Sequence, residues 1–291
     1  MNSLHAVQAA SWSGPFSDDD RRNAVAALEA GKIVVLSNLP FVLREEERAL
    51  LSPSVSDGKA KNVSLDPAGR IKNTAAAGEA RTQLAAMMER FAGSAVELIG
   101  GLFPIYRQRL ERARTSFRPV EIEGRPASPI HDDTRLHVDA FPTTPMRGRR
   151  ILRLFTNINP DGLARVWNVG EPFPDMAQRL LPRVFEPMPV KNWLLAAVGA
   201  TKGRRSAYDN LMLGLHDQAK LDANYQRRCP KSRIDFQPGT TWLCYTDQVM
   251  HAALSGQHVL EQTFHLDVEA MAEPDRAPIR VLETLTRRAL A

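Results

Sequence analysis

A histidine and an acidic residue two positions apart can bind a metal ion when both lie on a β-strand. His137-Val138-Asp139 occurs in the extended stretch LHVDAF, and alternate residues of a strand point to the same face. Such a pair and a later histidine can supply three ligands on one face of a metal ion, and such a triad leaves coordination positions open. The pair therefore predicts a metal centre if a third ligand follows.

The His-x-Asp pattern alone is weak, since the seven histidines and 33 acidic residues predict about 0.8 chance occurrences. The chain has three. His131-Asp132-Asp133 lies in a proline-rich turn, and His265-Leu266-Asp267 has no histidine after it. His137 and Asp139 are therefore the favoured pair, although the histidines could instead serve as surface or core hydrogen-bonding groups.

The third ligand is expected just past a strand that follows a tight turn. The segment PGTTWLCYTDQVMHAA supplies the turn Pro238-Gly239, a strand over residues 240–245, and then His251. Two other histidines compete for the role: His258 falls in a polar turn, and His265 would lie deeper along a following strand. His251 is favoured.

Arg153 interrupts an otherwise apolar strand, RRILRLFTNI. An unpaired charge in such a strand is costly, so an anion must face it. That anion is either the carboxylate of a small bound dicarboxylate or an internal carboxylate. Arg118 and Arg165 are further candidates for contacts with an anion, with surface positions as the alternative.

The first part of the chain is mainly helical. Ser17 and the three aspartates after it predict a helix N-terminus, and residues 33–36 form an apolar run typical of a buried strand. Residues 79–99 carry apolar side chains at helical spacing. Residues 52–74 are polar, with two prolines and two glycines, and predict a long loop that could act as a lid.

The later part is rich in predicted strands. The turn Asn159-Pro160-Asp161-Gly162 separates two apolar runs and favours a β-hairpin between them. One helix is expected over residues 208–225. The predicted strands cover residues 149–157, 164–169, 240–245 and 260–267.

Composition restricts the class of protein. Of the 291 residues, 43% are hydrophobic and 24% are charged, which is typical of a folded globular chain, and no stretch is apolar enough to span a membrane. The net charge of +5 suits an anionic substrate or membrane surface better than a nucleic acid. No export signal is evident, so the cytoplasm is expected. Cys229 and Cys244 are expected to be structural thiols.

A single domain over residues 1–291 is expected, because no internal repeat or linker composition appears. Residues 1–116 form the mainly helical part, residues 117–270 the β-core, and residues 271–291 a C-terminal helix or tail. The fold class is α+β, with N-terminal helices packed on an antiparallel β-core.

Three segments resemble the Kdo hydroxylases, iron(II)- and 2-oxoglutarate-dependent dioxygenases that act on 3-deoxy-D-manno-oct-2-ulosonic acid (Kdo). The resemblance extends from about residue 18 to residue 268. It implies a double-stranded β-helix (a jelly-roll, cupin-like core), metal ligands at His137, Asp139 and His251, and arginines on 2-oxoglutarate, of which Arg153 matches best. The segments are HVDAFPTTPMRGRRILRLFTNINP, RVWNVGEPF and PGTTWLCYTDQVMHAALSGQHVLEQTFHL.

The chain departs from the broader superfamily at one place. Many relatives have an arginine about ten residues after the last metal histidine, whereas this chain reads Leu260-Glu261-Gln262-Thr263. The arginine that anchors the cosubstrate must therefore come from another position.

The resemblance also implies the reaction. Kdo in Kdo-lipid A would be hydroxylated at C3 to give the sugar Ko during assembly of the lipopolysaccharide inner core, with ascorbate as reductant in vitro. The acceptor lies in a membrane, so peripheral association with the inner membrane is expected. The alternatives are a related dioxygenase with another small-molecule or lipid substrate, and a non-enzymatic sugar- or anion-binding β-barrel. The oligomeric state is not predicted.

Overall fold

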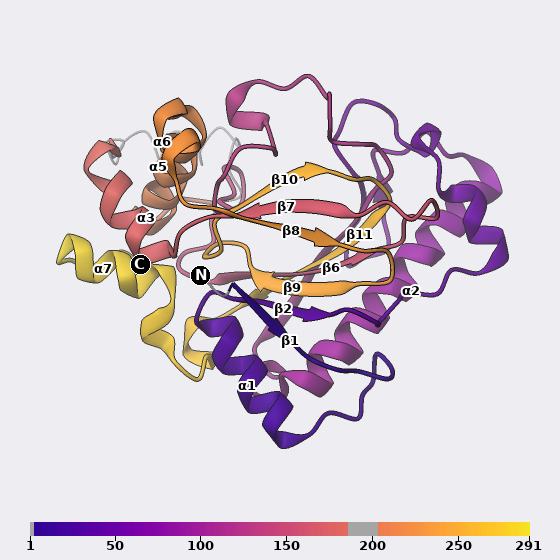
Figure 1. Cartoon of the computed structure of the whole chain (residues 1–291), viewed down its shortest axis with the longest axis horizontal. Coiled ribbons are helices and arrows are strands. Elements are labelled where there is room, and N and C mark those ends of the chain that lie inside the picture. Colours follow the sequence, from indigo (N-terminus) through magenta and orange to yellow (C-terminus); the bar gives the residue numbers. More distant parts are fainter. Residues whose placement is uncertain (1–2, 186–202) are drawn as a thin grey trace.

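The computed structural model describes residues 3–185 and 203–291, and its strands form two sheets (Figure 1). Apart from the parallel pair at one edge, the strand pairs in the described residues are antiparallel. The smaller sheet runs through β10 (His251–Ser255), β7 (Arg165–Val169) and β8 (Ser232–Phe236). The larger sheet runs, in spatial order, through β1 (Leu4–Ala6), β2 (Ile33–Leu36), β9 (Thr241–Tyr245), β6 (Arg150–Asn157), β11 (Val259–Leu266), β5 (Leu110–Arg118), β3 (Val63–Leu65) and β4 (Ile71–Lys72).

Aromatic side chains fill the space between the two sheets. Phe155 and Trp242 project from the larger sheet and meet Trp167 and Phe236 of the smaller one. The ring centroids of Phe236 and Trp242 lie 4.1 Å apart, and the two rings are stacked. This packing holds the sheets face to face, as in a jelly-roll, and confirms the α+β prediction with a β-sandwich core.

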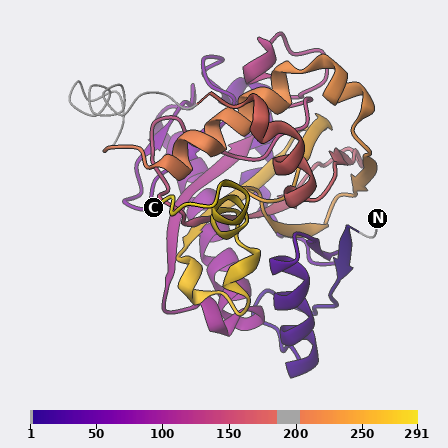
Figure 2. The ribbon, with the colours of Figure 1, turned by 90° about the vertical axis from the view of Figure 1, so that its left-hand side faces the viewer.

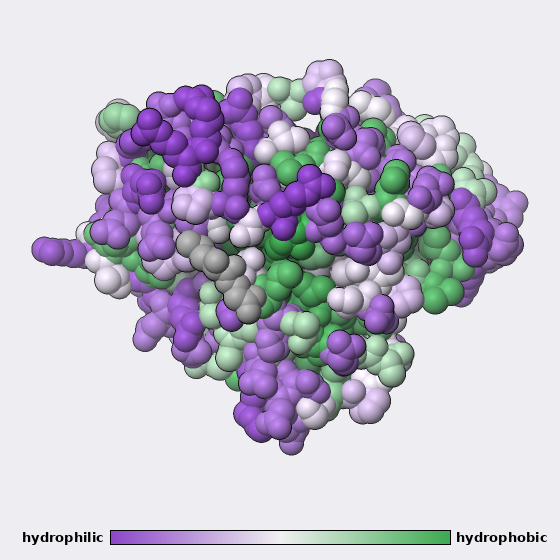
Figure 3. All heavy atoms as spheres, viewed as in Figure 1, coloured by the Kyte–Doolittle hydropathy of each residue, from purple (hydrophilic) through white to green (hydrophobic). Residues whose placement is uncertain are grey.

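Helices cover the other face of the larger sheet and one end of the molecule. Helix α2 packs on β5, β3 and β11 through its apolar stripe. Figure 2 shows α3, α5 and α7 together beside the ends of the strands. In Figure 3, hydrophilic residues cover the surface over the outer helices. The helices are α1 (Asp18–Glu29), α2 (Gly78–Leu102), α3 (Phe173–Leu180), α5 (Ala207–Leu221), α6 (Ala223–Arg228) and α7 (Pro278–Thr286).

Several predicted elements are confirmed. Ser17 caps α1 and accepts a hydrogen bond from the backbone N–H of Asp20, and the run over residues 33–36 is a fully buried strand. The helix expected over residues 79–99 is α2, and the four predicted strands of the later part are β6, β7, β9 and β11. Both cysteines are free and buried. Within the described residues, no helix is long and apolar enough to cross a membrane.

The predicted hairpin is wrong. Strand β6 pairs with β9 and β11 in the larger sheet, whereas β7 pairs with β8 and β10 in the smaller one. The turn sequence at residues 159–162 therefore carries the chain from one sheet to the other. Asn157 stabilises this crossing, because its side-chain amide donates to the carbonyl oxygens of Leu163 and Phe236.

Two other predictions need correction. The segment over residues 52–74 is not a structureless loop, since it contains β3 and β4, which extend the larger sheet. The helix expected over residues 208–225 is divided into α5 and α6. Asp222 ends the first helix and caps the second, where its carboxylate accepts from the backbone N–H groups of Asn224 and Tyr225.

Candidate metal centre

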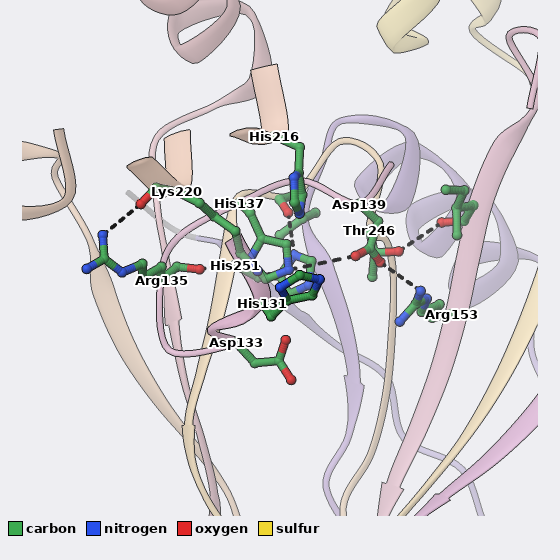
Figure 4. A network of polar contacts seen from close by, with 12 residues as sticks. His131, Asp133, Arg135, His137, Asp139, Arg153, His216, Lys220, Thr246 and His251 are labelled. Carbon is green, nitrogen blue, oxygen red and sulfur yellow. Dashed lines mark hydrogen bonds and ion pairs between the residues drawn. The ribbon is translucent and has the colours of Figure 1, made fainter. Parts of the chain in front are cut away.

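A pair of backbone hydrogen bonds brings the two favoured histidines together. The N–H of His137 donates to the carbonyl of His251 at 3.0 Å, and the N–H of His251 donates to the carbonyl of His137 at 2.9 Å. His137 thus lies in an isolated β-bridge, and not on a regular strand as expected. The N–H of Asp139 donates to the carbonyl of Thr246 at 2.7 Å, which fixes the third residue beside the other two (Figure 4).

Both imidazole rings are oriented by their Nδ1 atoms. The Nδ1 of His137 is 2.7 Å from the carbonyl oxygen of Arg135, and the Nδ1 of His251 is 2.8 Å from that of Val249. A carbonyl can only accept, so each Nδ1 carries the proton and each Nε2 keeps a free lone pair. One ligand atom from each of His137, Asp139 and His251 lies within 4.8 Å of the others. This geometry suits a divalent metal ion.

The surroundings of the three side chains set their protonation states in a way that favours metal binding. Burial lowers the pKa of both His137 and His251, so the rings are neutral. Burial alone would raise the pKa of Asp139, but the positive charge of Arg153 outweighs it and the pKa is lowered, so the carboxylate is charged. Two neutral imidazoles and one carboxylate are the protonation states that metal binding requires.

The competing histidines lie outside this cluster. Among the described residues, His137, Asp139 and His251 form the group that could hold a metal ion, and neither His258 nor His265 belongs to it. His258 adopts a positive φ of 58° in the turn between β10 and β11, and its N–H donates to the carbonyl of Arg118. His265 lies on β11 beside Phe141, with ring centroids 6.3 Å apart.

A cavity of about 70 Å³ adjoins the cluster and is lined by the three arginines singled out in the sequence, Arg118, Arg153 and Arg165. Arg153 has internal partners: its guanidinium is 3.2 Å from Asp139 and 3.1 Å from Glu261. The internal salt bridge, which the sequence left open, is therefore present. Arg118 also pairs with Glu261, through a nitrogen–oxygen distance of 2.5 Å.

Arg165 differs from the other two arginines. It is 3% exposed, its Nη1 donates to the carbonyl of Gly256 at 2.6 Å, and its buried Nε has no hydrogen-bond partner. No carboxylate in the described residues lies within ion-pair distance of it. Burial, together with the nearby charge of Arg118, lowers the pKa of Arg165 to about 9, whereas the carboxylates beside Arg153 outweigh burial there and raise its pKa. Arg165 is thus a buried cation that no carboxylate of the described residues neutralises.

The sequence did not reveal several residues around the cluster. The ring of His216 on α5 lies 5.4 Å from that of His137, and Lys220 lies one helical turn further on (Figure 4). Asp133 lines the small cavity and pairs with Lys61 at 2.5 Å. Burial opposes its ionisation, but Arg118 and Lys61 hold the pKa of Asp133 at about 2. Two of these residues were named beforehand for other reasons: Asp133 in a rejected His-x-Asp pattern, and Glu261 at the position where many relatives have an arginine.

The fold and the cluster together define a non-haem iron dioxygenase. Residues 11–289 match the model of the 3-deoxy-D-manno-oct-2-ulosonic acid (Kdo) hydroxylase family, and the chain belongs to this family. No curated protein sequence matches the chain.

Solved structures of the Kdo hydroxylase KdoO are similar to the chain throughout. The structure with α-ketoglutarate and Fe(III) is 44% identical, with a TM-score of 0.96 and coverage of 99% of this chain and 97% of KdoO. The structure with cobalt(II) is 45% identical, with the same TM-score and coverage.

Proposed function

We propose that this chain hydroxylates Kdo with iron(II), 2-oxoglutarate and dioxygen. The observation that carries the proposal is the His137, Asp139 and His251 cluster beside an arginine-lined cavity, in a chain of the Kdo hydroxylase family. When bound there, iron(II) would activate dioxygen, which is the oxidant: 2-oxoglutarate would supply two electrons and take up one oxygen atom as it is converted to succinate and carbon dioxide, and the other oxygen atom would enter a C–H bond.

The metal ligands are His137, Asp139 and His251. The carbonyl groups that accept from the two Nδ1 atoms keep each Nε2 pointed at one position. The aromatic ring of Trp167, stacked on His251 with centroids 5.0 Å apart, and the ring of Phe155 wall the cavity. These rings exclude water from the reacting atoms, which strengthens every charge interaction in the pocket.

Arg165 is the principal anchor for the distal carboxylate of 2-oxoglutarate, with Arg118 and Arg153 beside it. Its lack of a carboxylate partner supports this role, because a buried guanidinium gains most from a bidentate anion. Arg153 and Arg118 are already held by Glu261, so they shape the pocket and contribute positive charge. Metal binding by Asp139 would draw its charge toward the ion and leave the arginines more attractive to an anion.

The acceptor we propose is Kdo-lipid A, hydroxylated at C3 to give Ko. The carboxylate and phosphates of that acceptor suit a chain with a net charge of +5. Because the acceptor is embedded in a bilayer, we place the protein at the cytoplasmic face of the inner membrane as a peripheral protein whose binding weakens with salt. Residues 1–291 act as one domain in this proposal.

A product assay tests the reaction. Purified protein with iron(II), ascorbate and 2-oxoglutarate should add one oxygen to Kdo-lipid A, and tandem mass spectrometry should locate it on the sugar. Oxygen on an acyl chain would indicate the related dioxygenase with a different substrate. Failure to form succinate with any acceptor would favour the non-enzymatic sugar-binding alternative.

The ligand assignment has its own test. Alanine at His251 should abolish turnover and cobalt(II) binding, because two ligands hold a divalent ion far more weakly than three. The matched control is His258→Asn, which removes a histidine outside the cluster and tolerates the positive φ of that position. Loss of cobalt binding in the control, with retention in His251→Ala, would refute the assignment.

A further inference from the structure

A second and larger cavity lies close to the metal cluster. It has a volume of about 590 Å³ and is lined by the turn between β3 and β4, by residues of β4, β5 and β11, and by the segment after Asp139. Phe141 forms its inner wall, and the guanidinium of Arg153 lies 5.6 Å from the centre of that ring. A small cavity lined by Asp139, Phe141 and Arg149 shares the last two of these residues with the groove. The groove thus begins beside a proposed metal ligand.

The strand register shows how far the groove extends. Thr263 on β11 lies opposite Arg153 on β6, so the groove starts one strand away from that arginine. Moving outward, Ser116 on β5 faces Ser64 on β3, which in turn faces Lys72 on β4. Neighbouring strands are spaced about 4.8 Å apart, so the backbone of Lys72 lies about 14 Å from β11.

The groove is lined by more cations than anions. Lys72 and Arg114 are exposed, and their side chains have no ion pair or hydrogen bond within residues 3–185 and 203–291. Arg149 pairs with Glu111 at 2.6 Å, and Arg70 pairs with Asp66 at 2.8 Å. Lys72 and Arg114 are therefore the cations that remain available to an external anion.

His265 provides an independent sign of a ligand at the inner end. Its side chain lines the groove, the residue is 9% exposed, and its buried Nδ1 has no hydrogen-bond partner. The nearby hydroxyl of Thr263 also lines the groove. A buried polar atom without a partner costs free energy, and a ligand hydroxyl would satisfy it.

We propose that this groove binds the acceptor in two parts. His265 and Thr263 hydrogen-bond to hydroxyls of the sugar that reacts, while Arg114 and Lys72 bind a second oxyanion further along the acceptor. The oxyanion is either the carboxylate of a neighbouring acidic sugar or a phosphate of the glycolipid. This inference rests on the proposed function and adds the length and charge pattern of the substrate that the site accepts.

Kinetics of a double variant tests the outer part. In Lys72→Ala/Arg114→Ala, the KM for Kdo-lipid A should rise about tenfold or more, with kcat within about twofold and the KM for 2-oxoglutarate unchanged, because the lost contacts lie away from the reacting atoms. The matched control, Arg22→Ala/Lys32→Ala, removes the same charges from residues outside the groove and should leave all constants unchanged.

Acceptors of different length identify the oxyanion. A phosphate-free Kdo disaccharide that shows the rise in KM identifies the sugar carboxylate, whereas a rise seen only with the phosphorylated acceptor identifies the phosphate. A single Kdo glycoside should show no difference between the double variant and the wild-type protein. Equal KM values for wild type and double variant with every acceptor would overturn the outer part of the proposal.

His265→Gln tests the inner part, since it should raise the KM for every acceptor, including the single Kdo glycoside. An unchanged KM in this variant would overturn the role of His265. The proposed function fails in a different way. If the wild-type protein binds cobalt(II) and 2-oxoglutarate but hydroxylates none of these acceptors, the reaction is wrong, whatever the variants do.

Discussion

At the scale of single residues, the three arginines that line the small cavity differ in how their charges are neutralised. Glu261 serves both Arg118 and Arg153, whereas Arg165 has only a backbone carbonyl. A buried charge without a counter-charge is unstable unless a ligand supplies one. An anion bound in the small cavity would therefore supply the missing counter-charge, and it would stabilise Arg165 more than the other two arginines.

Replacing Arg165 should weaken 2-oxoglutarate binding most. Loss of a buried, charge-assisted contact costs about 2–5 kcal/mol, so Arg165→Met should raise the KM for 2-oxoglutarate more than tenfold. Arg165→Lys, which keeps the charge but loses the bidentate fork, should have an intermediate effect. Cobalt(II) binding measured by calorimetry should survive in both variants. A larger effect for Arg153→Met than for Arg165→Met would assign the anchor to Arg153.

His265 should make the stability of the protein depend on pH. Burial, with a further contribution from Arg149, lowers the pKa of His265 to about 4. As the pH falls, the unfolded chain takes up a proton on His265 near the ordinary pKa of about 6.5, before the folded protein does. The contribution of the neutral ring to the free energy of unfolding is therefore complete above pH 6.5 and declines as the pH falls toward 4. Between pH 7.5 and 5, urea unfolding should show the advantage of wild type over His265→Gln shrinking by about 2 kcal/mol. A constant difference would mean that the ring binds its proton equally well in the folded and unfolded protein, so that its pKa is not lowered by folding.

The sequence predicted the members of the cluster better than their surroundings. Residue parity selected His137 and Asp139, and the turn-strand context selected His251, although His137 proved to lie in an isolated bridge. His216 could not be found in this way, because a histidine on a helix carries no information about the segment it will face. Local pattern identifies candidate ligands, while contacts between distant elements depend on the tertiary fold.

At the scale of elements, a buried ion pair joins the start of β6 to the turn before β10. Arg150 is fully buried, donates to Asp247 at 2.8 Å and lies 3.8 Å above the ring of Tyr245. The neighbouring Gln248 accepts from Arg150 and donates to the backbone carbonyl of Glu29 in α1. The turn that precedes His251 is thereby fixed to the larger sheet and to the N-terminal helix.

Breaking this pair should destabilise the protein strongly. Arg150→Met leaves Asp247 buried without its partner, which typically costs about 3–5 kcal/mol. Urea unfolding should show this loss, and Arg150→Met/Asp247→Asn should recover part of it because no buried charge remains unpaired. Arg22→Ala, which removes an exposed ion pair with Asp19, should cost less than about 1 kcal/mol. A cost of that small size for Arg150→Met would show that the pair does not hold the turn.

The failed hairpin also belongs to this scale. Asn, Pro, Asp and Gly at residues 159–162 correctly indicated a change of direction, but turn chemistry is the same whether the chain returns to its own sheet or passes to a facing one. The difference depends on β9 and β11, which already occupy both edges of β6. No window of sequence around the turn contains that information.

At the scale of the whole molecule, metal binding should stabilise the complete fold. A ligand that binds only the native state adds about 2.7 kcal/mol at 100 times its Kd. Cobalt(II) should therefore raise the Tm of the wild-type protein, and the increase should disappear in Asp139→Ala. The same increase in that variant would place the metal elsewhere.

The backbone bridge between His137 and His251 has a consequence for folding kinetics. The two residues are far apart along the chain, and β10, which starts at His251, joins the smaller sheet by pairing with β7, an element much earlier in the sequence. Contacts with such large sequence separation form slowly, since loop-closure entropy is lost before they contribute. Cobalt(II) added during refolding should thus bind late, and the rate of its binding would report when the two sheets come together.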